Sequence, residues 1–116
     1  MSEDSAVVKV TDDTFDAVVL GSRLPVVIDF WADWCPPCRP VAKIVAELAE
    51  EFRGQITVAK INSDANPEVT RTYRVMSMPT LLFFRQSVVV NSIVGARPKS
   101  YFRQALTDLM TPYVNR

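Results

Sequence analysis

The sequence contains no histidine and only two cysteines, Cys35 and Cys38. Without histidine, the chain cannot build the Cys–His or Ser–His pairs of most nucleophilic hydrolases, or the histidine-containing sites of most zinc enzymes. A four-thiolate metal site would need cysteines from a second chain. One short cysteine pair is also too little for a disulfide-stabilised secreted fold. These absences direct attention to the cysteine pair itself.

The chain also lacks a net charge, a glycine-rich loop and a long apolar run. Thirteen Lys and Arg residues balance thirteen Asp and Glu residues, so no excess charge favours nucleic acid or an anionic membrane. The three glycines are scattered and form no phosphate-binding loop. The longest apolar run, "VVIDFWA", is too short to span a bilayer, and the acidic N-terminus does not resemble a signal peptide. We therefore expect a cytoplasmic protein with no membrane or nucleic-acid partner.

The order of apolar runs predicts a single α/β domain. A chain of 116 residues suits one domain, which we expect at residues 7–116 after a flexible tail at residues 1–6. Strands are expected at "VVKVT", "VVIDFWA", "ITVAKIN", "TLLFF" and "VVVNSIV", and the last two are close enough to form a hairpin. The resulting order, β-α-β-α-β-α-β-β-α, predicts a central mixed five-stranded sheet flanked by four helices.

Helix boundaries are predicted from capping residues. Asp12 is expected to cap the first helix, and Gly54 to end the second, which follows the cysteines. Asn66 and Pro67 are expected to open the third, and Pro98 the fourth.

The motif Cys35-Pro36-Pro37-Cys38 lies between a predicted buried strand and a predicted helix. Unpaired N–H groups and the helix dipole favour negative charge at the start of a helix, so a thiolate at Cys35 is stabilised and reactive. Cys38 lies one turn further on the same face and can close a disulfide with Cys35. A structural disulfide or a buried thiol pair is the alternative, but so small a ring constrains the unfolded chain very little. The pattern favours a redox-active pair, with Cys35 as nucleophile and Cys38 as resolving thiol.

The segments "VVIDFWADWC", "KINSDANPEV", "YRVMSMPTLLFF" and "VGA" resemble the thioredoxin family in order and spacing, over nearly the whole chain. This resemblance implies the thioredoxin fold and a protein disulfide reductase that works by dithiol–disulfide exchange. It implies no bound cofactor beyond the redox-active disulfide, with electrons coming from NADPH through a flavin-containing thioredoxin reductase. The expected partners are that reductase and protein disulfide substrates, and nothing in the sequence requires more than a monomer.

Asp29 is a charged residue within an apolar strand, so burial should raise its pKa. The resemblance implies that Asp29 is the buried acid that takes the proton of Cys38, with Lys60 as its neighbour. An edge-strand aspartate and a lysine lying along the surface without a role are the alternative.

Pro79 precedes a predicted strand, where a first-position or cis proline is tolerated. The resemblance implies that Pro79 is cis and faces the disulfide, and that the backbone of Met78 binds an extended substrate; a plain core methionine is the alternative. A flat apolar rim for docking is then expected from Trp34, Pro36, Pro37, Met78, Pro79, Val94 and Gly95. Trp31 is expected to pack beneath the site.

The chain also departs from the family pattern. Pro36 stands where thioredoxins have glycine, and a proline there resembles glutaredoxins and bacterial disulfide oxidants, so Pro36 and Pro37 are expected to tune the redox properties. Pro40 replaces a kinking proline that the family places at the position of Lys43, which predicts a stiff, proline-braced turn. Ser63 is expected to make the docking surface more polar. Three functions stay open: a reductase, an oxidase or isomerase with the same chemistry, and a non-catalytic binding module.

Overall fold

The structure is a computed structural model, and it describes residues 5–111. Its elements follow the predicted order: β1 (Val7–Lys9), a π-helix (Asp16–Leu20), β2 (Val26–Trp31), α1 (Cys38–Glu51), β3 (Thr57–Asn62), α2 (Pro67–Thr72), β4 (Thr80–Arg85), β5 (Val88–Val94) and α3 (Lys99–Met110). The α/β class and the thioredoxin-type order are therefore confirmed. The first helix differs from expectation in being a short π-helix.

The five strands form one mixed sheet in the order β1-β3-β2-β4-β5. β1, β3 and β2 run parallel, whereas β4 is antiparallel to β2 and β5 is antiparallel to β4. β2 is therefore the central strand, and its first five residues are buried. This explains why the run "VVIDF" shows no alternation of polar and apolar residues: both faces of the strand are covered.

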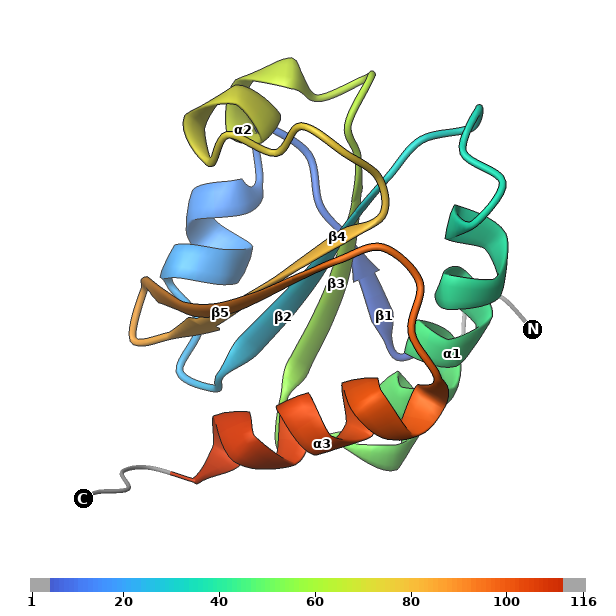
Figure 1. The fold of residues 1–116 in the computed structure, drawn as a ribbon. Helices are drawn as coiled ribbons and strands as arrows, with labels where there is room; N and C mark the ends of the chain where they lie inside the picture. The colour runs from blue at the N-terminus through green and yellow to red at the C-terminus, as the bar shows by residue number, and fades with distance from the viewer. Residues whose placement is uncertain (1–4, 112–116) are drawn as a thin grey trace.

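Helices cover both faces of the sheet (Figure 1). α1 and α3 pack on one face, where Val45 and Leu106 join side chains of β2, β3, β4 and β5 such as Phe83. The π-helix and α2 cover the other face. The Phe15, Tyr73 and Phe84 rings meet there, with ring centres 5.4–6.0 Å apart. Because both faces are filled, the sheet is a rigid support for the loops at its edge.

The predicted capping role of Asp12 is wrong for the first helix. Its carboxylate instead accepts the backbone N–H groups of Glu68 (3.1 Å) and Val69 (2.9 Å), at the start of α2. Asn66, which was expected to cap α2, makes no capping bond with its side chain but accepts the N–H of Asp12 at 2.8 Å. The start of α2 is thus capped by a loop more than fifty residues earlier in the chain.

Two other boundaries refine the sequence predictions. α1 ends at Glu51, before Gly54, which adopts a positive φ of 82° in the following turn. The β4–β5 hairpin turns through Gln86 and Ser87, which have φ values of 51° and 69°. Positive φ at both central residues is the requirement of a type I′ turn, which favours Asn or Gly. The chain forms this turn without either residue.

Of the tail expected at residues 1–6, residues 1–4 lie outside the described residues, as do 112–116 at the other end of the expected domain. Ser5 accepts the N–H of Val7 at 3.2 Å, and Ala6 packs against the core. The boundary expected between tail and domain stays a prediction.

Candidate redox site

Cys35 and Cys38 form a disulfide with 5.4 Å between their Cα atoms. Cys38 is the first residue of α1, and Cys35 lies in the loop that leads there from the end of β2. Two short-range backbone bonds fold this loop: Cys35 N–H donates to Ala32 O (3.2 Å) and Cys38 N–H donates to Cys35 O (3.1 Å). The pair therefore sits at the junction of the central strand with a helix, as the spacing predicted.

The prolines around the disulfide occupy the turn and the first turn of α1. Pro36 and Pro37 are exposed, and Pro37 already has helical backbone angles (φ −69°, ψ −12°). Pro40 has no N–H to donate, and the Pro36 carbonyl instead accepts the N–H of Arg39 at 3.4 Å. Proline is tolerated here because the first N–H groups of a helix have no partner within it. The predicted stiffness of this turn stays a prediction.

Asp29 lies in the interior behind the disulfide. It is 2% exposed, and it is the register partner of Lys60 in the parallel pairing of β2 with β3. Burial raises the pKa of Asp29 to about 7, and the positive charge of Lys60 opposes that rise. Within residues 5–111, the Oδ1 atom of Asp29 has no hydrogen-bond partner. The alternative of an exposed edge-strand aspartate is therefore wrong.

A hollow of about 210 Å³ connects this carboxyl group with the disulfide; we call it the Asp29 hollow. Its lining residues are Asp29, Trp31, Ala32, Asp33, Cys38, Arg39, Ala42 and Lys60. It has room for several water molecules, since one occupies about 30 Å³ in the liquid. Asp29 and Cys38 therefore line the same hollow.

Trp31 has the packing position that the sequence predicted, against the group formed by Ala32, Cys35 and Cys38. Its Nε1 atom is buried and has no hydrogen-bond partner in the described part of the chain. Arg39 and Asp33 in the lining of the Asp29 hollow were not predicted. Asp33 lies in the loop just before Cys35, and Arg39 follows Cys38 in α1. Their closeness to the cysteines in the sequence is the feature that could have indicated them.

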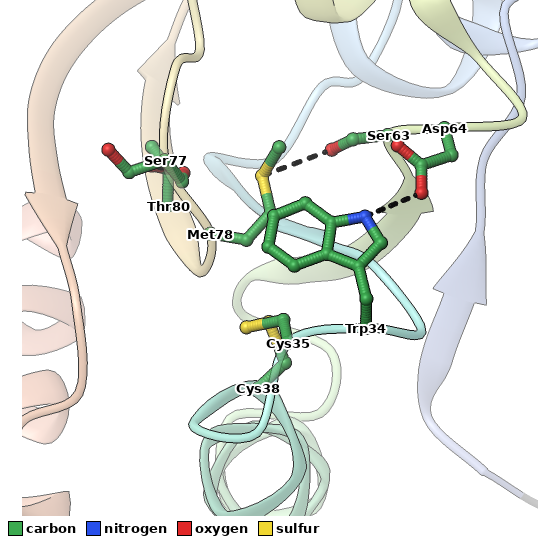
Figure 2. Close-up of a disulfide and its surroundings, with 8 residues drawn as sticks. All are labelled: Trp34, Cys35, Cys38, Ser63, Asp64, Ser77, Met78 and Thr80. Carbon is green, nitrogen blue, oxygen red and sulfur yellow. Dashed lines mark hydrogen bonds between the residues drawn. A yellow bond between two sulfur atoms is a disulfide. The ribbon is translucent and has the colours of Figure 1, made fainter.

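Trp34 and Met78 also lie beside the disulfide (Figure 2). Trp34 is 64% exposed, and its indole N–H donates to Asp64 Oδ2 at 2.8 Å. Met78 packs against the disulfide group and precedes Pro79 through a cis peptide bond, as the resemblance implied. Two loops and the end of β3 thus meet around one disulfide.

The predicted docking rim is only partly at the surface. Val94 is 50% exposed, and Met78 and Gly95 are half-buried. Pro79 is less than 2% exposed, and its carbonyl accepts the N–H of Gly95 at 2.8 Å. Pro79 therefore supports the rim from beneath and offers almost no surface of its own, which corrects the sequence prediction.

Ser63 does not make the docking surface more polar, as the sequence predicted, because it is buried with an exposed fraction of 4%. Its hydroxyl donates to Met78 Sδ at 3.4 Å, and its N–H donates to Trp31 O at 2.8 Å. The next residue, Asp64, is the partner of Trp34 and was not predicted. No local pattern in the sequence indicates the contact of Asp64 with Trp34.

Within residues 5–111 no group of three or more His, Cys, Asp or Glu side chains could hold a metal ion. No helix in the same range has the length and apolar character needed to cross a bilayer.

Comparison with known proteins gives consistent matches. The family model "Thioredoxin" matches residues 6–108. A thioredoxin of Mycolicibacterium smegmatis is 49% identical over 112 residues, covering 95% of this chain and 100% of that protein. Thioredoxin 1 of a Nostoc species is 48% identical, covering 88% of this chain and 95% of its own length. A bifunctional thioredoxin reductase/thioredoxin of Mycobacterium leprae is 46% identical over 89% of this chain and 22% of that larger protein.

Proposed function

The chain belongs to the thioredoxin family and is a thiol–disulfide oxidoreductase, and from this we propose that it reduces disulfides of other proteins through Cys35 and Cys38. The observation that carries the proposal is the Cys35–Cys38 disulfide at the start of α1, next to a hollow that reaches the buried Asp29. The disulfide supplies the two-electron chemistry, and the hollow supplies a route for the proton.

In the first step, the Cys35 thiolate attacks one sulfur of the substrate disulfide. A bond forms between Cys35 and that sulfur, and the second substrate sulfur leaves as a thiolate that takes up a proton. In the second step, Cys38 loses its proton and attacks the Cys35 sulfur. The Cys35–Cys38 disulfide forms, and the first substrate sulfur leaves as a thiol. Two electrons have then passed from the cysteine pair to the substrate.

Asp29 is the proposed acceptor of the Cys38 proton, with Lys60 as the neighbour that modulates it. Support comes from the pKa of Asp29, which burial raises to about 7, so the carboxyl group can take up and release a proton near neutral pH. Asp29, Lys60 and Cys38 all line the Asp29 hollow. A proton can therefore pass between them through water without crossing the protein core.

The proposed docking rim lies beside the disulfide, where Trp34 and Met78 are found (Figure 2), and it includes Val94, which is 50% exposed. Exposed aromatic and thioether groups suit a surface that contacts many different proteins. The backbone of Met78 is the proposed partner of an extended substrate segment, with Gly95 alongside and Pro79 beneath. Pro36 and Pro37 border the same surface and are the proposed redox-tuning residues.

Regeneration of the dithiol by a thioredoxin reductase that draws electrons from NADPH is part of the proposal, as is a cytoplasmic location. The M. leprae relative supports the reductase partner, because its name joins a thioredoxin reductase and a thioredoxin in one chain. No bound cofactor is needed in this scheme beyond the disulfide.

The test couples NADPH oxidation to the reduction of insulin, with a bacterial thioredoxin reductase and this protein added. We expect the wild type to support turnover, Cys35→Ser to abolish it, and Cys38→Ser to stop at a mixed disulfide that mass spectrometry detects. Turnover that survives in the Cys35→Ser, Cys38→Ser double variant would contradict the roles of the two cysteines. Absence of turnover in the wild type would contradict the proposal and favour a non-catalytic binding module.

The direction of electron flow is tested separately by the equilibrium reduction potential of the pair, followed by Trp34 and Trp31 fluorescence. A value near the roughly −270 mV of thioredoxin supports the reductase. A value near the roughly −120 mV of the bacterial oxidant would instead support an oxidase or isomerase.

A further inference from the structure

Two adjacent residues in the turn directly after β3, Ser63 and Asp64, each bind one of the side chains beside the disulfide (Figure 2). Asp64 Oδ2 accepts the indole N–H of Trp34 at 2.8 Å, and Ser63 Oγ donates to Met78 Sδ at 3.4 Å. Trp34 and Met78 come from different loops, so a single dipeptide ties both walls of the site to the sheet.

Ser63 is suited to holding Met78 in place because its own backbone is fixed to the sheet. Its N–H donates to Trp31 O at 2.8 Å, which extends the pairing of β3 with the central strand β2. Its side chain is buried, with an exposed fraction of 4% for the residue. A buried hydroxyl needs a hydrogen-bond partner, and the thioether sulfur of Met78 is the one that the structure provides.

Methionine otherwise has little preference for one conformation. Its side chain has three rotatable bonds and no branch, so a free methionine at a docking surface loses conformational entropy when a partner binds. The hydroxyl of Ser63 fixes the sulfur position before binding, while Met78 packs against the group formed by Ala32, Cys35 and Cys38. A surface that is ordered in advance binds with a smaller entropic cost.

We propose that Ser63 is a positioning residue for substrate docking: it orients the Met78 thioether beside the disulfide and thereby sets the affinity for protein substrates. This inference rests on the proposed function, because it assumes that protein substrates dock beside Met78. It concerns the Michaelis complex and leaves the chemistry of Cys35 and Cys38 unchanged.

A double-mutant cycle tests the inference in the insulin-reduction assay, with KM and kcat measured separately. Removing one neutral hydrogen bond corresponds to about a five-fold change, so Ser63→Ala should raise KM about five-fold and leave kcat unchanged. In the Met78→Leu background the sulfur acceptor is already lost, and Ser63→Ala should then change KM no further. An unchanged KM for Ser63→Ala, or the same increase in both backgrounds, would overturn the proposal.

Ser77→Ala is the matched control, because its side chain points away from the disulfide in Figure 2 and its carbonyl accepts the Thr80 hydroxyl at 2.6 Å. It should leave KM unchanged. The rate at which iodoacetamide alkylates Cys35 should be equal in all these variants. A slower alkylation of Cys35 would show that a substitution had altered the redox centre itself. The alkylation rate therefore separates failure of this inference from failure of the proposed function.

Methyl relaxation by NMR gives a second test, which compares the wild type with Ser63→Ala. In the reduced and the oxidised wild type, the Met78 methyl group should be more ordered than that of Met76, which is 88% exposed. Ser63→Ala should bring the Met78 methyl order close to that of Met76. Equal mobility of the two methyl groups in the wild type would overturn the positioning role.

Discussion

Asp29 lies directly opposite Lys60 in the register of β2 and β3, and both residues line the Asp29 hollow next to Cys38. Asp29 is on the central strand β2 and Lys60 is on its neighbour β3, so both side chains are held by the interior of the sheet. An acid in this position is costly for folding and useful for proton transfer. Burial of Asp29 should therefore affect both the free energy of unfolding and the rate of the proposed reaction.

The stability of the protein should fall as the pH rises from about 4 to about 7. The Asp29 pKa is about 7 in the folded state and 3.8 as a model value, so within this window the folded protein holds a proton that the unfolded chain has lost. The free energy of unfolding should decrease by at most about 4 kcal/mol across the window. Urea unfolding at several pH values measures this slope.

Asp29→Asn is the matched variant for that experiment. It should remove the slope and be more stable than the wild type at pH 8. Because Cys38 loses its proposed proton acceptor, the resolution of a mixed disulfide should slow by on the order of 100-fold. A wild-type rate of resolution in Asp29→Asn would show that Asp29 takes no part in proton transfer.

Asp12→Ala should destabilise the protein by about 1 kcal/mol, with a range of about 0.5–2 kcal/mol. Its carboxylate accepts two backbone N–H groups at the start of α2, and these donors would lose their partner. Urea unfolding of Asp12→Ala and of the neighbouring Asp13→Ala provides the comparison. Equal stability of the two variants would contradict the capping role of Asp12.

Pro36→Gly should loosen the turn between the cysteines and speed amide hydrogen exchange at Cys38 and Arg39. Glycine frees the φ angle that proline fixes, and the change should also lower stability by about 0.4–1 kcal/mol through the unfolded chain. Pro67→Gly is the control, because Pro67 also opens a helix but lies outside the redox site. If exchange at Cys38 responds equally to both substitutions, the predicted stiffness of the Pro36–Pro37 turn is wrong.

Arg85→Ala should destabilise α3 by about 2 kcal/mol, as expected for hydrogen bonds from a charged donor. One guanidinium nitrogen of Arg85 donates to the carbonyls of Asp108 (3.3 Å), Leu109 (2.6 Å) and Thr111 (2.9 Å), where the helix ends. Arg85→Lys retains the charge near the helix C-terminus and should be intermediate. Similar thermal unfolding of all three proteins would mean that these bonds contribute little.

Much of the fold could be predicted because its signals are local. The unbroken apolar run before the cysteines indicates a strand covered on both faces, and the structure places it at the centre of the sheet. Cys35, Cys38 and Asp29 could be singled out for the same reason: their chemistry contrasts with the sequence immediately around them. The order of strands and helices followed from these runs and from the turn residues between them.

The errors concern contacts between segments that are distant in the sequence. Asp12 was placed on the nearest helix, but its partners are the N–H groups of Glu68 and Val69. Ser63 was expected at the surface, because no local pattern shows that Met78 from another loop covers it. The Asp29 hollow combines residues of β2, β3, α1 and the loop before α1, and only the folded chain brings these together.

The Asp29 hollow also has a consequence for how the two proposed roles can be separated by experiment. None of its lining residues belongs to the proposed docking rim of Trp34, Met78 and Val94. The proposed proton transfer and the proposed docking therefore depend on different side chains around the same disulfide. A substitution in one set can then be made without altering a residue of the other.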